Sequence, residues 1–317
     1  MKAKTAYLLT LMMAPMLYGF PSNPSLSPMT TPLRSMGEGP LFYLDYSNLI
    51  GVDNKTFVEF YVQVGYDELQ FIKYHDRFQA SYDLDVIVYD SENNVIEDYA
   101  TIDAFEVETF SETQSSNKAR ISLVGFSFDP GQYRVKALLR DVETQKSSII
   151  EGSFSARSFQ SQELMMSDIQ LSQNIKPAED GQPYVKNQRY VEPTAVRIFA
   201  HGLSDIYIYF EIYNLAYTPK TSDSTYTAIF MFYNNKNEKI AQFKRTHMKP
   251  GKTSAHSLKV PVEYFMSGEY TLTVRVQDND TGQSAESSRS FIVFDSSISL
   301  NDPSSDEALY NGINLEN

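Results

Sequence analysis

The stretch DPGQYRV, residues 129–135, predicts a tight turn that leads directly into a β-strand. Asp129 and Gly131 suit the turn. The side chain of Tyr133 is expected to pack inward while its hydroxyl group bonds back to the main chain, as in the tyrosine corner of immunoglobulin-like sandwiches. This segment therefore favours an antiparallel β-sandwich.

A second copy of this unit, MSGEYTL, occupies residues 266–272. It keeps Gly268 and Tyr270 but has Met266 where the first copy has an aspartate. Self-similarity at the scale of a domain indicates a tandem repeat. Five residue pairs share one offset of 137 along the chain: Gly131 and Gly268, Tyr133 and Tyr270, Asp141 and Asp278, Thr144 and Thr281, and Phe154 and Phe291.

Alternating apolar and polar residues predict strands in both halves, and helical periodicity is nowhere sustained. One such strand lies at residues 55–66 (KTFVEFYVQVGY). Its residues 58–64 resemble 206–215, and the strand and turn at 85–96 match 228–240. We predict an all-β chain with two tandem immunoglobulin-like or fibronectin-like antiparallel β-sandwich domains. With no cysteine or tryptophan, both would lack the disulfide and the core tryptophan of antibody domains.

The ends of the chain differ from these repeats. Lys2 and Lys4 precede an apolar run at residues 6–18 that is too short to span a bilayer, which is typical of a secretory signal, although a buried helix is the alternative. The predicted parts are a signal peptide at 1–19, a proline- and serine-rich linker at 20–40, a first sandwich at 41–156, a linker at 157–164, a second sandwich at 165–294 whose first strand is 167–171 (SDIQL), and a disordered acidic tail at 295–317.

Composition excludes several classes of function. Without cysteine the chain can have no disulfide, thiol nucleophile, thiolate metal site or lipid anchor on an N-terminal cysteine. A formal net charge of −13 disfavours nucleic acid and anionic membranes as partners, because both would repel it. No later stretch is apolar enough for a transmembrane span.

Several short phrases resemble a known family: LFYLDYS at residues 41–47, LMMSDIQLS at 164–172, VEPTAVRIF at 191–199 and QDNDTGQSAESSRSF at 277–291. Together they are similar to the N-terminal region of exported bacterial proteins of the Bacteroidetes type that are named for a C-terminal GWxTD domain. The chain has no tryptophan, so it lacks that motif, and no activity of the GWxTD domain carries over. The resemblance implies export to the periplasm or cell surface of a Gram-negative bacterium.

No catalytic pattern is apparent in the sequence. The four histidines are scattered without metal-ligand spacing, and there is no nucleophile elbow, phosphate loop or dinucleotide fingerprint. We therefore predict no enzyme activity and no cofactor. The remaining route to catalysis would be a carboxylate pair in a cleft between the two sandwiches.

The segment DNDTG at residues 278–282 is the one candidate metal site, because Asp278 and Asp280 offer the alternating oxygen ligands that calcium takes. The equivalent segment of the first repeat, residues 141–145 (DVETQ), lacks the second aspartate and the glycine. A plain hairpin turn is therefore the favoured interpretation, and calcium the weaker alternative.

The candidate binding surface is a tyrosine-rich strand at residues 206–213. Its even-numbered residues are apolar and should face the core, which leaves Tyr207, Tyr209, Glu211 and Tyr213 on the opposite face. Tyrosine offers rigid contact area with a polar end, so this face could bind protein or stack sugar rings. Alternatively, the first domain or a linker simply covers it.

Two functions follow from these features. In the first, the chain is an exported, non-catalytic interaction or structural module of the bacterial cell envelope that binds envelope proteins through its sheet faces. In the second, it is a pair of carbohydrate-binding modules whose tyrosine face meets polysaccharide.

Overall fold

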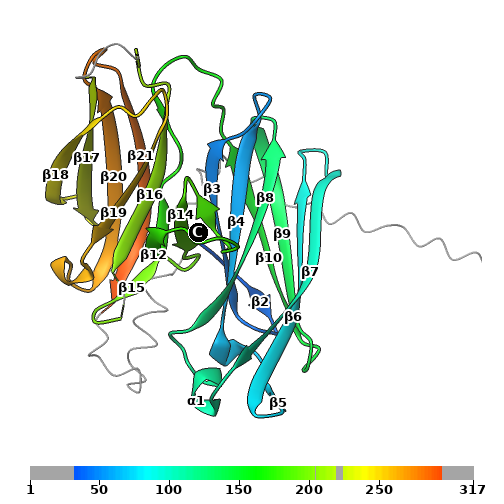
Figure 1. Cartoon of the computed structure of the whole chain (residues 1–317). Coiled ribbons are helices and arrows are strands. Elements are labelled where there is room, and N and C mark those ends of the chain that lie inside the picture. The colour runs from blue at the N-terminus through cyan, green and yellow to red at the C-terminus, as the bar shows by residue number, and fades with distance from the viewer. Residues whose placement is uncertain (1–31, 204, 219–223, 295–317) are drawn as a thin grey trace, which may run out of the picture.

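A computed structural model describes residues 32–203, 205–218 and 224–294. The predicted signal peptide and acidic tail lie outside these residues. Within them the chain is all-β, and its antiparallel sheets form two β-sandwiches that lie side by side (Figure 1). No helix in this part of the chain is long and apolar enough to cross a membrane. The helical segments there are α1 (Phe110–Thr113), η1 (Tyr66–Glu68) and η2 (Val262–Tyr264).

The first sandwich encloses one core between two antiparallel sheets. One sheet has the strand order β1-β3-β4-β8, and the other has β2-β10-β9-β6, with β5 and β7 both paired to β6. The strands are β1 (Leu33–Arg34), β2 (Met36–Gly37), β3 (Phe42–Ile50), β4 (Thr56–Gly65), β5 (Ile72–Tyr74), β6 (Arg77–Tyr89), β7 (Val95–Val107), β8 (Ala119–Phe128), β9 (Gly131–Asp141) and β10 (Ser147–Ala156).

The second sandwich repeats this plan. One sheet has the order β11-β16-β12-β14-β13 with β19 also paired to β16, and the other has β15-β21-β20-β17-β18. Only the pairing of β15 with β21 is parallel among the described strands. The strands are β11 (Met165–Met166), β12 (Gln170–Pro177), β13 (Val185–Lys186), β14 (Arg189–Pro193), β15 (Ile198–Ala200), β16 (Ile206–Tyr213), β17 (Thr225–Asn234), β18 (Lys239–Met248), β19 (Ser254–Val260), β20 (Gly268–Asp278) and β21 (Ser284–Phe294).

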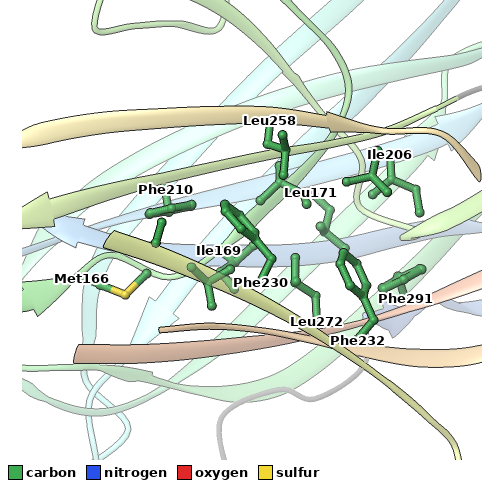
Figure 2. Close-up of a cluster of buried hydrophobic side chains, with 14 of the residues drawn as sticks. Met166, Ile169, Leu171, Ile206, Phe210, Phe230, Phe232, Leu258, Leu272 and Phe291 are labelled. Atoms are coloured by element: carbon green, nitrogen blue, oxygen red, sulfur yellow. The ribbon is translucent and has the colours of Figure 1, made fainter. Parts of the chain in front are cut away.

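Buried apolar side chains form two separate clusters, one from residues 42–156 and one from 164–293. In the second cluster, side chains from the two sheets point toward one another (Figure 2). Phe210 on β16 meets Phe230 on β17, with 6.2 Å between ring centroids. Close packing of this kind, and not disulfides, must stabilise both domains.

Both tyrosine corners form. The hydroxyl group of Tyr133 donates a hydrogen bond to the Asp129 carbonyl at 2.8 Å, and that of Tyr270 donates to the Met266 carbonyl at 2.9 Å. Because the acceptor is a main-chain carbonyl, methionine serves as well as aspartate. This explains why the second copy tolerates the substitution.

The repeat also preserves what each corner tyrosine packs against. Tyr133 lies opposite Phe154 across β9 and β10, and Tyr270 lies opposite Phe291 across β20 and β21. Both ring pairs are stacked at an interplanar angle of 26°, with centroids 5.5 and 5.6 Å apart. Residues matched by sequence offset thus occupy matched places in space.

Three expectations about the linkers and the first strand are corrected. The segment 20–40 contains β1 and β2, because its extended backbone finds ladder partners in β3 and β10. The strand predicted at 167–171 begins at Gln170 and continues to Pro177. The connection at 157–164 is not a free linker, because two of its side chains, Phe159 and Leu164, are buried.

Candidate functional site

The tyrosine-rich face of β16 lies opposite the core, as the alternation predicts. It is not an open platform, however. Tyr209 and Tyr213 are 1% and 2% exposed, while Tyr207 and Glu211 are partly exposed. The expectation of a tyrosine face available for binding is therefore wrong for Tyr209 and Tyr213, because other parts of the chain cover them.

Hydrogen bonds show what covers this face. The two carboxylate oxygens of Glu211 accept from the hydroxyl groups of Tyr209 and Tyr213 at 2.7 and 2.9 Å. Asn187, in the β13–β14 hairpin, donates to Tyr209 at 2.7 Å, and the Ile50 amide of the first domain donates to Tyr213 at 3.2 Å. Burial, and then the nearby Glu211 carboxylate, raise the pKa of both tyrosines far above its usual value. The phenols are neutral hydrogen-bond donors at the domain junction.

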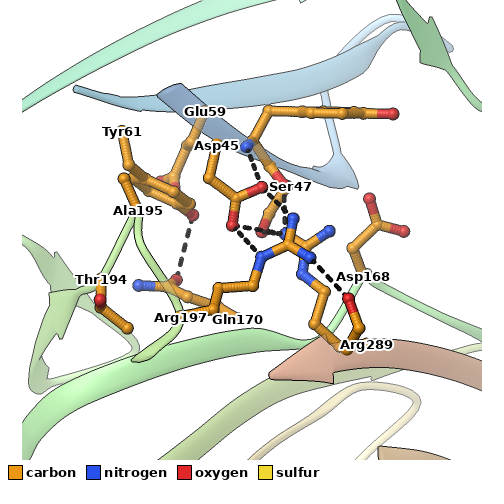
Figure 3. Close-up of polar contacts among 12 residues, drawn as sticks. Asp45, Ser47, Glu59, Tyr61, Asp168, Gln170, Thr194, Ala195, Arg197 and Arg289 are labelled. Atoms are coloured by element: carbon orange, nitrogen blue, oxygen red, sulfur yellow. Dashed lines mark hydrogen bonds and ion pairs between the residues drawn. The ribbon is translucent and has the colours of Figure 1, made fainter. Parts of the chain in front are cut away.

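The centre of the junction is an ionic cluster (Figure 3). Asp45 projects from β3, and the guanidinium group of Arg197 in the second domain forms two hydrogen bonds with it, one of 2.7 Å. The guanidinium of Arg289 lies 3.4 Å from the same carboxylate and also donates to Ser47 at 3.1 Å. Burial alone would raise the pKa of Asp45, but the two arginines outweigh it and hold the pKa below its usual value.

A second buried ion pair lies beside this cluster. The Lys186 ammonium group of β13 donates to the carboxylate of Glu59 and to the side-chain oxygen of Gln170. Tyr61 donates to Glu59 at 2.7 Å. Each domain contributes part of this network, so its charges are compensated only when the two domains are in contact.

Polar contacts continue along the outer face of the first domain. The Gln63 side-chain oxygen accepts from the Ala195 amide at 2.8 Å, and Asp168 accepts from the amide and the side chain of Asn48, both at 2.8 Å. The polar residues on this face of β3 and β4 alternate with core residues, a pattern that normally predicts exposure to solvent. They are buried because the second domain lies against them, so the junction fixes the two sandwiches relative to each other.

The candidate calcium loop already contains a cation. The Lys249 ammonium group, which is fully buried, lies 2.6 Å from Asp278 and 2.7 Å from Asp280. It also donates to the Ala216 carbonyl at 2.8 Å. Three oxygen ligands therefore surround a lysine at the place where the sequence suggested a metal. Among the described residues, no group of three or more histidine, cysteine, aspartate or glutamate side chains could hold a metal ion.

The repeat explains why an aspartate occupies this position. In the first domain Asp141 accepts from the Gln70 amide at 2.8 Å, and in the second Asp278 accepts from the Ala216 amide at 2.8 Å. Each also accepts from the amide three residues later, at 2.7 and 3.3 Å. The two aspartates connect a hairpin turn to a loop from the opposite sheet, which is a structural role.

We expect calcium to leave the melting temperature of the protein unchanged. The Lys249 ammonium group is already paired with both carboxylates, so a divalent ion would have to displace a buried charge. Differential scanning calorimetry with calcium at about 10 mM, far above the Kd of most calcium modules, checks this. A clear rise in Tm that disappears in Asp280→Asn would contradict it.

An open groove lies on the second domain. It has a volume of about 790 Å³ and lies between the edge strands β18 and β19, next to η2. Tyr264 and Met266 at its rim are 77% and 81% exposed, and Ile240 is also exposed. Lys236 and Arg245 add positive charge, whereas Lys259 is paired with Asp205. Sequence reasoning missed this groove because its residues come from four separate segments.

Comparison with known proteins assigns no family: no family model and no curated protein matches the chain. Solved structures that match include a β-glucuronidase of Bacteroides uniformis and a putative β-galactosidase of Bacteroides fragilis. Each is 9% identical and covers 74% of this chain, with TM-scores of 0.24 and 0.23. The chain spans only 26% and 32% of their lengths.

Proposed function

We propose that the chain is an exported, non-catalytic interaction module of the bacterial cell envelope that binds a protein partner at the open edge of its second domain. Its two sandwiches would be immunoglobulin-like or fibronectin-like. The duplicated strand order and the two tyrosine corners support that assignment.

The groove between β18 and β19 is the observation that carries this proposal. It places exposed Tyr264 and Met266 beside Ile240, with Lys236 and Arg245 at its wall. Aromatic residues, methionine and arginine are enriched at protein interfaces, and an exposed apolar patch with a polar rim marks such a site. The basic wall, on a chain of net charge −13, favours a partner segment that is acidic and apolar.

The buried junction supports the same function. A fixed arrangement of two domains presents the groove in one orientation, which reduces the entropy lost on binding. By contrast, the carbohydrate alternative depended on a tyrosine platform, and Tyr209 and Tyr213 are covered. No observation on the described residues now favours that alternative.

A pull-down from the native envelope tests the proposal. We expect wild-type protein to capture a specific envelope protein, and Tyr264→Ser with Met266→Ser to reduce its capture about tenfold or more, as for loss of interface hot spots. Val52→Ser is the matched control, because it removes an equally exposed apolar side chain from a turn of the first domain. Equal capture by all three proteins, or capture of glycan alone, would refute the proposal.

A further inference from the structure

Each sandwich has a long edge strand on the outer side of the molecule. Among the described strands, β7 pairs only with β6, and β18 pairs only with β17. The two edges lie at opposite ends of the molecule (Figure 1). Most residues of both strands are exposed. An unpaired edge of this kind exposes main-chain donors and acceptors to which another strand can add.

The two edges carry opposite charges. Glu97 and Asp98 lie on β7, and Lys244 and Arg245 lie on β18. Within the part of the chain that the structure describes, none of these four side chains forms a hydrogen bond or an ion pair. Farther along β7, Arg120 of β8 binds Asp103 at 2.6 and 2.8 Å, so the first half of β7 is the free half.

One antiparallel register brings both charge pairs together. If Glu97 lies opposite Arg245, then Asp98 lies opposite Lys244 and Tyr99 lies opposite Phe243. The faces also agree. Tyr99 pairs with the core residue Val86, and Phe243 pairs with the core residue Phe230, so both rings lie on the core-facing side of their sheets. Opposite charges and aromatic pairs across neighbouring strands are both stabilising.

Because the two domains are repeats, the main-chain donors and acceptors on the outer edges of β7 and β18 can pair in this register. In both domains the register of the edge strand shifts next to its hairpin turn, which leaves Ile96 and Ile240 unpaired. Asp90 and Asn234 begin these turns, and each accepts from the amides two and four residues later. The edge strands are thus equivalent, with Tyr99 matching Phe243. Along both strands, the same alternate residues direct their N–H and C=O groups outward. Residues that lie opposite each other in this register therefore either both offer these groups or both do not, as an antiparallel pair requires.

We propose that copies of this chain associate head to tail, with β7 of one copy adding to β18 of the next. The head-to-tail association rests on the proposed function, because it identifies the acidic and apolar partner at the open edge as a second copy of the chain. Symmetric pairing of two β7 strands, or of two β18 strands, would place like charges together and is disfavoured. The contact is heterologous, so each pair of copies keeps one free β7 edge and one free β18 edge to which a further copy can add.

Sedimentation velocity of the purified chain, up to about 200 µM, tests the proposal in a range suited to weak interfaces. We expect the sedimentation coefficient to rise with concentration at about 0.1 M salt. The rise should weaken at about 1 M salt, where the Debye length falls from about 10 Å to about 3 Å. The double variants Glu97→Lys/Asp98→Lys and Lys244→Glu/Arg245→Glu should each weaken association about tenfold or more.

Mixing the two double variants should restore association, because each supplies the charges that the other lacks. Asp76→Lys with Glu143→Lys is the control, since it reverses two exposed charges outside both edges. A chain that stays monomeric, or association that the edge reversals leave unchanged, would overturn the proposal. Capture of an envelope protein dependent on Met266 by a monomeric chain would overturn self-association alone and leave the proposed function standing.

Discussion

Replacing Asp45 with alanine is expected to lower the free energy of unfolding by about 3–5 kcal/mol, the usual effect of removing one partner from a buried ionic cluster. The substitution leaves the guanidinium groups of Arg197 and Arg289 facing each other in the junction without a counter-charge. Both arginines are buried, so water cannot compensate them. Urea denaturation followed by circular dichroism measures the change.

The surface pair Arg275 and Glu286 is the matched control. Both side chains are about half exposed, and Arg275→Ala should cost no more than about 1 kcal/mol. Equal losses in the two variants would contradict the assignment of Asp45 to a buried cluster.

The effect of Asp45 should also depend on pH in one direction. In the folded protein the pKa of Asp45 lies below its usual value. The ionised carboxylate therefore stabilises the fold fully above the pKa of the unfolded chain, about 3.9, and this stabilisation is lost as the pH falls toward the folded pKa. The stability difference between wild type and Asp45→Ala should therefore shrink below about pH 4. A difference that stays constant in acid would count against the pairing.

Lys249→Met is expected to destabilise the second domain by about 3–5 kcal/mol, for a related reason. Methionine keeps most of the length of the buried side chain but leaves Asp278 without its cation, 2.6 Å away in the wild type. Backbone amides still bind that carboxylate, so its charge is retained at a cost. Chemical denaturation of the full chain measures the loss.

Two companion variants sharpen this test. Lys176→Met removes an exposed lysine paired with Glu179 and should change stability by less than about 1 kcal/mol. Adding Asp278→Asn to Lys249→Met should recover part of the loss, because it removes the uncompensated charge. If the double variant were less stable than Lys249→Met alone, hydrogen bonding by Asp278 would matter more than its charge.

The features that could be predicted from the sequence are local ones, set by residues close together along the chain. The turn before Tyr133 and its copy before Tyr270 are local, and both form the expected hydrogen bond. Alternation in β16 correctly separated core residues from the opposite face. These features follow from the period of a strand and the chemistry of a turn.

The junction could not be predicted in the same way. Arg197 is 152 residues from Asp45, and no periodic pattern connects them. Asp45 and Glu59 occupy outward positions on their strands, where charged residues usually meet water, so the sequence favoured an exposed face. Only the placement of the second domain buries them. The contact between the domains also covers Tyr209 and Tyr213, so the tyrosine-rich face of β16 is not available as the binding surface that the sequence suggested.

The two buried ion pairs of the junction take their carboxylates, Asp45 and Glu59, from the first domain and their cations, Arg197 and Lys186, from the second. Either half made alone would expose these charges to water without their counter-charges. The covalent connection at residues 157–164 is then not what holds the halves together. Two polypeptides divided in that segment and produced in the same cell would recognise each other by these charges and reassemble as a non-covalent pair.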